Sequence, residues 1–260
     1  MHRGETDVTT EHPRAGDLGA GDRQVARVQP AGGPFGTLGF AHHPEPEVLH
    51  GAMAELNKFL MVYKFGLAEI ETKINILAEE LAHRGRGNPI EHVTPRLKSL
   101  GSITAKARRL NCPLHVDDLR TRIRDIAGIR IVCGFVPDVY TVARMLTRQP
   151  DVHLVVTKDY IAQPKANGYR SLHLIVEIPV FLSDQVVAVP VEVQLRTVAM
   201  DFWASLEHKI YYKHDADVPA ALRAELAAAA EDAARLDERM QRLHHEIHGP
   251  RLIDGDHTRT

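Results

Sequence analysis

The segment VPVEVQLRT, residues 189–197, decides the fold class because apolar and polar residues alternate along it. Its apolar positions are Val189, Val191, Val193 and Leu195. Successive side chains of a β-strand point to opposite faces, so the other face would carry Glu192, Gln194 and Arg196. A carboxylate held in mid-strand beside an amide and a guanidinium is typical of the wall of an active site. We therefore expect a strand with one face in the core and the other in a functional pocket.

The pattern around this segment mixes strand and helix signals. Strands are expected near 128–135, 152–157, 170–178 and 186–195, and helices near 95–110, 138–148 and 196–212. The last two strands follow each other with no helix between them. This order favours an α+β fold with a mixed sheet flanked by helices over a doubly wound parallel sheet.

Two long amphipathic helices are predicted at the ends of this region. Apolar residues recur in steps of four and three from Leu56 to Leu81 and from Leu222 to Ile247, the second run after Pro219. Both stripes would pack on the chain's own core, and their heptad spacing leaves room for helix pairing between subunits. Phe202 and Trp203 are also expected in the core.

Composition sets the domain limits and the broad class. Residues 1–45 hold eight of the 18 glycines and little periodicity, so we expect a disordered leader, one domain over 46–250 and a disordered tail at 251–260. A net charge of −2 argues against bulk nucleic-acid binding. Cys112 and Cys133 show no metal spacing and are expected to be inert thiols in a reducing cytoplasm. With no long apolar run and a polar N-terminus, we expect a cytoplasmic protein that is neither membrane-spanning nor secreted.

The segment KDYIAQPKANGYRSLHLIV, residues 158–176, gathers cations and rings around Gly168. Its polar residues are Lys158, Lys165, Asn167, Tyr169, Arg170 and His173. A turn at the glycine would present cations and a flat ring together. We therefore expect a pocket for a phosphorylated purine.

A helix is predicted to begin at Thr94 and Pro95, with threonine as its cap and proline in its first turn. Its buried stripe would be Leu97, Leu100, Ile103, Ala107 and Leu110. The opposite face would carry Lys98, Ser102, Lys106 and Arg109, which suit the grip of a polyphosphate. The alternative is a solvated basic face, which periodicity alone favours.

Asp125 stands just ahead of the strand expected at Gly128 to Gly134. Together with Glu192 on another strand it would suit Mg²⁺, which takes oxygen ligands and substrate phosphates. A capping role is the alternative for Asp125. Arg130 would point away from the apolar face of its strand. The chain contains neither a P-loop nor a dinucleotide-binding glycine motif, so those sites are unsupported.

Four segments together resemble the synthetase domain of the RelA/SpoT family. They are IEHVTPRLKSLGSITAKARR (90–109), RIRDIAGIRIVC (122–133), KDYIAQPKANGYRSLH (158–173) and VEVQLRTVAMDFWASLEHKIYYK (191–213). The resemblance spans about residues 48 to 247. Because no separate hydrolase or regulatory region accompanies it, the chain is most similar to the small alarmone synthetases of that family.

The resemblance implies a nucleotidyltransferase-like fold and a GTP pyrophosphokinase. Such an enzyme transfers the β,γ-pyrophosphate of ATP to the 3′-hydroxyl of GDP or GTP, giving ppGpp or pppGpp. By resemblance Asp125 would hold Mg²⁺, and Glu192 would bind Mg²⁺ or deprotonate the acceptor hydroxyl. On the ATP side it implies Arg96 and Arg130 around adenine, and Lys98, Ser102, Lys106 and Arg109 on the phosphates. On the acceptor side it implies Tyr169 on guanine, Lys158, Lys165, Asn167 and His173 around the nucleotide, and Gln194 and Arg196 on the same wall.

The resemblance also implies a homo-oligomer, with a tetramer favoured. Relatives that are stimulated by their product bind pppGpp between subunits through an aromatic residue and an asparagine, where this chain has His92 and Asp201. A carboxylate repels a polyphosphate, so we expect little activation. Two other functions stay open: a toxin of the same family that pyrophosphorylates the 3′ end of tRNA, and a catalytically silent guanine-nucleotide or RNA-binding module.

Overall fold

The computed structural model describes residues 46–83, 88–212 and 219–249. The leader and the tail expected at 1–45 and 251–260 lie outside the described residues.

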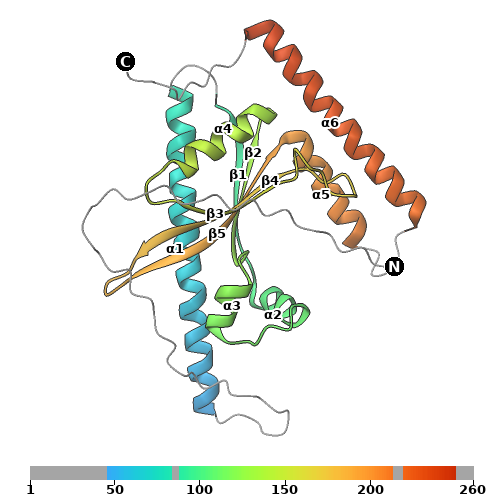
Figure 1. The fold of residues 1–260 in the computed structure, drawn as a ribbon. Coiled ribbons are helices and arrows are strands. Elements are labelled where there is room, and N and C mark those ends of the chain that lie inside the picture. Colours follow the sequence, from blue (N-terminus) through green and yellow to red (C-terminus); the bar gives the residue numbers. More distant parts are fainter. Residues whose placement is uncertain (1–45, 84–87, 213–218, 250–260) are drawn as a thin grey trace.

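A five-stranded sheet forms the centre of the molecule (Figure 1). Its strands are β1 Ile90–Leu97, β2 Ala127–Cys133, β3 His153–Asp159, β4 Leu172–Phe181 and β5 Val186–Thr197. They lie in the order β1-β2-β5-β4-β3, with β2 and β5 parallel and the other neighbours antiparallel. The mixed α+β sheet predicted from the sequence is therefore confirmed.

Six described helices surround the sheet (Figure 1). They are α1 Pro46–His83, α2 Leu100–Arg109, α3 Val116–Arg122, α4 Val136–Thr147, α5 Val198–Tyr212 and α6 Ala220–His248. The long α1 contacts β1, β2, β4 and β5, and α4 contacts α1 and the central strands, so these two helices cover one face. Helix α5 contacts the end of β5, and α6 packs against α5.

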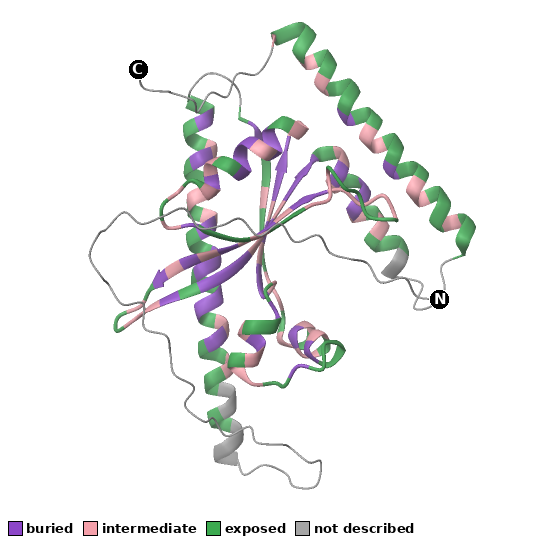
Figure 2. Cartoon of the chain, viewed as in Figure 1, coloured by how far each residue is buried: buried purple, intermediate pink, exposed green. Residues whose placement is uncertain are grey.

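The core lies between α1 and the sheet. The alternating apolar residues of β5, from Val189 to Leu195, are almost fully buried, as are Ile70 and Ile74 on α1. Figure 2 shows a buried stripe along α1 and a mostly exposed or half-buried α6. Helix and sheet meet most closely at Gly66, where a Cβ would lie 2.6 Å from Val189 Cγ1. Glycine at this position therefore sets the distance between α1 and the sheet.

The helix predicted to begin at Thr94 and Pro95 is wrong in its first turn and a half. Residues 90–97 pair with β2 as an edge strand, and helix α2 begins only at Leu100, with Ser99 as its N-cap. Pairing to β2 satisfies this backbone, and an edge strand tolerates the missing N–H of Pro95. Tertiary pairing therefore overrides a strong local helix signal. The expected stripe also fails at Leu110, which is 43% exposed just after the helix ends, whereas Ile103 and Ala107 are buried.

Two neighbouring residues of α5 have opposite environments. Trp203 is buried as expected, but Phe202 is 65% exposed, so the prediction that it lies in the core is wrong. Adjacent helical positions point about 100° apart, and only one of them faces the buried side. Phe202 instead belongs to an exposed apolar row spaced by four residues, namely Val198, Phe202, Leu206 and Ile210.

Both cysteines are free and buried. Burial raises the pKa of the Cys133 thiol to about 12, so this thiol stays protonated at neutral pH, as an inert core residue should. Within the described residues, no helix combines the length and the apolar character needed to cross a membrane.

Candidate active site

The sheet register lines up one polar or charged residue from each strand on the face away from α1. Across the sheet these partners are Thr94, Arg130, Gln194, His173 and Lys158. The next row towards the start of β2 pairs Arg96 with Gly128 and Gly128 with Glu192. Strand pairing therefore brings together side chains that are far apart in the sequence.

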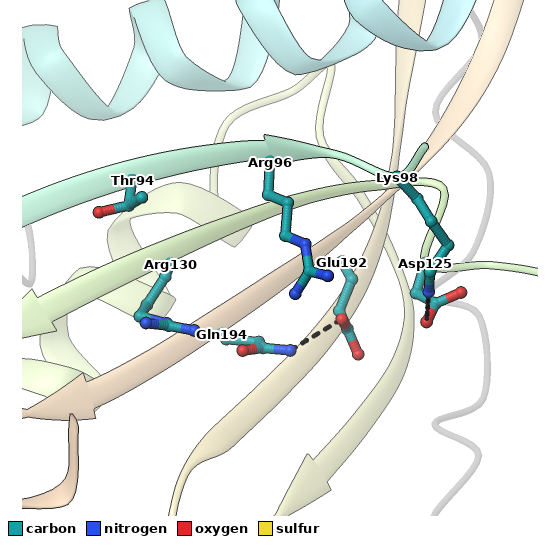
Figure 3. Close-up of a pocket in the computed structure, with 7 residues that line it drawn as sticks. All are labelled: Thr94, Arg96, Lys98, Asp125, Arg130, Glu192 and Gln194. Atoms are coloured by element: carbon teal, nitrogen blue, oxygen red, sulfur yellow. Dashed lines mark hydrogen bonds and ion pairs between the residues drawn. The ribbon is translucent and has the colours of Figure 1, made fainter. Parts of the chain in front are cut away.

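A pocket opens on this face of the sheet (Figure 3). Its lining residues are Thr94, Arg96, Lys98, Asp125, Arg130, Glu192 and Gln194. Six of these seven were predicted as site residues from the sequence, and Thr94 was missed. In Figure 3, Arg96 and Arg130 reach from neighbouring strands towards Glu192 and Gln194. The pocket combines three cations and two carboxylates, which suits a highly charged ligand and its counter-ion.

Asp125 forms ion pairs with two lysines on one side of the pocket. Lys98 Nζ and Lys106 Nζ lie 2.6 Å and 2.7 Å from Asp125 Oδ2. The other oxygen, Oδ1, is buried and has no hydrogen-bond partner among the described residues. Burial raises the pKa of Asp125, but the hydrogen bonds and charges of the two lysines outweigh burial, so the net shift is downward. Asp125 is therefore an anion with one oxygen unsatisfied.

The four residues predicted to share one helix face are separated by the later start of α2. Lys98 precedes the helix, yet it meets Lys106 at Asp125. Ser102 instead forms a 2.9 Å hydroxyl contact with Ser99 at the helix N-terminus, and Arg109 is exposed in the last turn. The structure thus brings two of the four together at Asp125 and leaves the other two at the ends of α2.

Glu192 lies in the middle of the pocket wall. Gln194 Nε2 donates to Glu192 Oε2 at 2.9 Å, and His173 Nδ1 lies 3.5 Å from Glu192 Oε1. Burial raises the pKa of Glu192, whereas His173 and Gln194 lower it, and the net shift is downward. An ionised carboxylate with hydrogen-bonding neighbours can accept a hydrogen bond from a substrate hydroxyl.

The second group of predicted site residues lies around Tyr169. Its hydroxyl lies 2.8 Å from His173 Nε2 and accepts a 2.6 Å hydrogen bond from Arg196 Nη2. Lys165 Nζ stands 4.6 Å from the ring centre of Tyr160 and 5.4 Å from that of Tyr169. A cation and several flat rings are therefore grouped here, as expected for a purine nucleotide site.

The loop that carries Tyr169 is held by α5 and α6. Asn167 Oδ1 accepts a bond from the Tyr169 amide, and its Nδ2 donates to Glu207 of α5 at 3.2 Å. Gly168 has φ +85°, and a Cβ there would lie 2.4 Å from the Cβ of Ala230 on α6. Lys158 lies farther out, exposed on the edge strand β3. The predicted acceptor residues are thus gathered, with Lys158 at their rim.

Sequence reasoning missed three supporting residues of this side. Tyr160 makes edge-to-face contacts with Tyr169 and His173, with ring centroids 6.0 Å and 5.3 Å apart. Asp159 Oδ1 accepts from two backbone amides of the following turn, and its Oδ2 accepts from Tyr140 at 3.0 Å. An aspartate ahead of a turn signals such a role in a sequence. The long-range contact of Tyr140 leaves no comparable pattern.

The donor set suits a hard cation that keeps other oxygen ligands. Among the described residues, no cluster of three or more His, Cys, Asp or Glu side chains is placed to hold a metal. Asp125 and Glu192 are the two carboxylates among the described residues that line the pocket. Mg²⁺ often binds through one or two carboxylates together with substrate phosphates and water. The unsatisfied Oδ1 of Asp125 fits this mode.

Comparison with known proteins gives one consistent result. A family described as a region found in RelA/SpoT proteins matches residues 95–217. The chain is 48% identical over 199 residues to the GTP pyrophosphokinase YwaC of Bacillus subtilis (strain 168), covering 76% of this chain and 95% of that protein. It is 40% identical over 190 residues to the GTP pyrophosphokinase YjbM of the same strain, covering 73% and 89%. The solved structure of small alarmone synthetase 1 from Bacillus subtilis bound to its product pppGpp superposes with a TM-score of 0.69 at 37% identity, covering 75% of this chain and 98% of that one.

Proposed function

Because the chain belongs to the RelA/SpoT family, as a GTP pyrophosphokinase of the small alarmone synthetase type, we propose that its pocket transfers pyrophosphate from ATP to GDP or GTP. The products would be ppGpp or pppGpp, together with AMP. One observation supports placing the reaction in this pocket. Glu192 and Gln194 lie between the cations around Asp125 and the Tyr169–His173 pair. A donor and an acceptor therefore fit on opposite sides of one carboxylate.

On the donor side, Arg96 and Arg130 would enclose the adenine between flat guanidinium planes. Lys98 and Lys106 would exchange part of their contact with Asp125 for the phosphates, which carry more negative charge than one carboxylate. Asp125 and Glu192 would hold Mg²⁺. When bound, the metal would neutralise phosphate charge as the leaving group departs.

On the acceptor side, Tyr169 would stack on guanine, with Lys165, Asn167 and His173 around it and Lys158 at the rim. Stacking and cation contacts would orient the ribose so that its 3′-hydroxyl reaches Glu192. Positioning of this kind is the main demand of phosphoryl-type transfer, since little covalent chemistry falls to the protein.

In the transfer itself, the 3′-oxygen forms a bond to the β-phosphorus of ATP. The bond from the β-phosphorus to the α,β-bridging oxygen breaks, and its electron pair leaves with AMP. Glu192 accepts the proton of the 3′-hydroxyl. The lowered pKa of Glu192 keeps it ionised at neutral pH, and a positioned base of this kind contributes roughly 10²–10⁴-fold.

The decisive experiment offers labelled ATP and Mg²⁺ with GDP, GTP, GMP or tRNA in turn. We expect label to appear on GDP or GTP, with stoichiometric AMP. Label on tRNA alone would assign the toxin activity of the same family. Binding of guanine nucleotide without any transfer would assign a silent binding module.

We further propose that the chain forms a homo-oligomer, with a tetramer as the expected state, and acts in the cytoplasm in the stringent response. Exposed apolar residues support the assembly: Val198, Phe202, Leu206 and Ile210 on α5, and Leu236, Met240, Leu243 and Ile247 on α6. Leu236 and Met240 are 53% and 49% exposed, so charged substitutions there should disrupt assembly without unfolding the subunit. Light scattering measures this directly, and a monomeric mass for the unmodified protein at micromolar concentration would contradict it.

A further inference from the structure

Asp201, in the first turn of α5, lies at the active site rather than standing as an isolated charge. Its Oδ1 accepts a 3.0 Å hydrogen bond from Arg196 Nη1 and lies 3.2 Å from Arg130 Nη1. One carboxylate oxygen is therefore shared by two guanidinium groups. The expectation from the sequence that Asp201 repels a phosphate did not include these two cationic neighbours.

Arg196 depends on this contact because it is buried. Its side chain is 7% exposed, and a buried charge that loses its partner is strongly destabilised. While Nη1 is held by Asp201, Nη2 donates to the Tyr169 hydroxyl at 2.6 Å and lies 3.4 Å from Gln194 Oε1. Asp201 thus fixes the guanidinium in the orientation that supports the ring on the acceptor side.

Arg130 connects the same Asp201 oxygen to the proposed donor side of the pocket. It lines the pocket from β2, with a side chain that is 35% exposed and an Nε that has no hydrogen-bond partner among the described atoms. The interaction with Asp201 therefore sets the orientation of a guanidinium assigned to adenine. Contacts link Arg130, Asp201, Arg196 and Tyr169 continuously, from the proposed ATP side to the proposed acceptor side.

We infer that Asp201 is a positioning residue that couples ATP binding to acceptor binding. An oxygen shared by two donors holds each less firmly than an oxygen that serves one. When ATP engages Arg130, the charge of Asp201 becomes available to Arg196, which then holds Tyr169 more firmly for guanine. Each substrate should therefore tighten the binding of the other. This inference rests on the proposed function, because it assigns Arg130 to ATP and Tyr169 to the acceptor.

The test measures GDP binding to the full chain by titration calorimetry, with Mg²⁺, in the absence and presence of a non-hydrolysable ATP analogue. For the unmodified protein we expect the analogue to lower the Kd of GDP about 5-fold. In Asp201→Asn, which keeps the shape but removes the charge, this ratio should fall to about 1 and the Kd of GDP alone should rise about 10-fold. Asp184→Asn, an equal charge change in the exposed β4–β5 turn, is the control and should behave like the unmodified protein.

Arg130→Gln gives an independent and opposite expectation. With its competitor removed, Asp201 serves Arg196 alone, so GDP should bind about 3-fold more tightly without ATP analogue. A residue that only stabilised the fold would not produce this gain. The gain should vanish when Arg130→Gln is combined with Asp201→Asn.

The inference is overturned if the unmodified protein shows no coupling, if Asp201→Asn retains it, or if Arg130→Gln weakens GDP binding. Should Asp201→Asn fail to fold, the Arg130→Gln result decides alone. The proposed function fails separately, when the unmodified protein makes neither ppGpp from ATP and GDP nor pppGpp from ATP and GTP. Synthesis with unchanged coupling in Asp201→Asn would remove this inference and leave the function standing.

Discussion

The two sides of the pocket are built in different ways. The proposed donor side stands on β1 and β2, whose backbone pairing with the rest of the sheet fixes Arg96 and Arg130. The acceptor side stands on the loop between β3 and β4, and this loop is held by side chains from α5 and α6. Changes in the helices should therefore act mainly on the acceptor, and on ATP only through the contact of Asp201 with Arg130. The comparison predicts which kinetic constant each substitution moves.

The largest effect is expected where the two sides meet. Glu192→Gln and Asp125→Asn should each lower kcat about 10²-fold or more, because the proposed metal ligand or base would be lost without a change of shape. Steady-state synthesis of ppGpp measures the loss, and unchanged thermal melting shows that the fold survives. Near-normal turnover in either variant would remove the carboxylate pair from the mechanism.

Tyr169→Ala should raise the KM of the acceptor about 10-fold or more, since base stacking contributes about 1–3 kcal/mol per ring. The Kd of ATP measured without acceptor should change by no more than about 2-fold, because the proposed donor side does not rest on this ring. Tyr169→Phe keeps the ring but loses the bonds to Arg196 and His173. It should therefore raise the KM of the acceptor, but by less than Tyr169→Ala does. An equal loss for both substrates would mean that the ring supports the whole site.

Substitutions at two glycines should distinguish effects on the acceptor side from effects on the core. Gly168→Ala meets both a positive φ and the Cβ of Ala230, so it should raise the KM of the acceptor about 3–10-fold. Its control is Gly66→Ala, which presses on Val189 and should lower the free energy of unfolding by about 1–3 kcal/mol without changing either KM. Chemical denaturation and steady-state kinetics on both variants give the answer. A pure stability loss in Gly168→Ala would contradict the role of the loop.

Two partly buried carboxylates, Asp237 and Asp125, should affect stability with opposite dependence on pH. Burial raises the pKa of Asp237 on α6, despite its hydrogen bond with Thr197, so its contribution to stability falls as pH rises above the unfolded pKa. The pKa of Asp125 is lowered, so its contribution is present at neutral pH and lost on acidification. Asp237→Asn should therefore raise the free energy of unfolding by up to about 1 kcal/mol at pH 7. The gain should shrink towards pH 4, and a constant gain would show that Asp237 is not the titrating group.

The smallest effect is expected from added pppGpp. His92 is exposed on β1, while the Asp201 carboxylate is occupied by two arginines and cannot donate a hydrogen bond. The sequence also predicts little activation, but on the ground that Asp201 repels phosphate. The structure gives a different reason, which is the pairing of Asp201 with Arg130 and Arg196. Titration into a steady-state assay should change the rate by less than about 2-fold, below the usual range of allosteric coupling. A several-fold rise would show that a cleft between subunits works without these contacts.

The elements with strong periodicity were predictable from sequence. The alternation in β5 places Glu192 and Gln194 on the pocket face, and the apolar steps locate α1 and α6. The lysines were also found, although by a helix that starts later than expected. Local chemistry was sufficient wherever one element alone determines which way a side chain faces.

Contacts between distant elements were not predictable. Residues 90–97 carry a helix-start signal, and only pairing with β2 turns them into a strand. Asp201 and Tyr140 act through partners on other elements, so nothing next to them in the sequence marks their role. The same limit applies to Phe202, whose exposed side faces away from the core of its own chain.

The parallel pairing of β2 with β5 has a consequence for how the enzyme acquires activity after synthesis. It joins Ala127 to Val191, whereas β4 and β5 form an antiparallel pair across a short turn. Closing a long segment costs more chain entropy than closing a hairpin, so the parallel pairing should form late. The row from Arg130 to Gln194 exists only once these strands are in register. A newly made chain should therefore gain catalytic competence in its final folding step, and partly folded chains should consume no ATP.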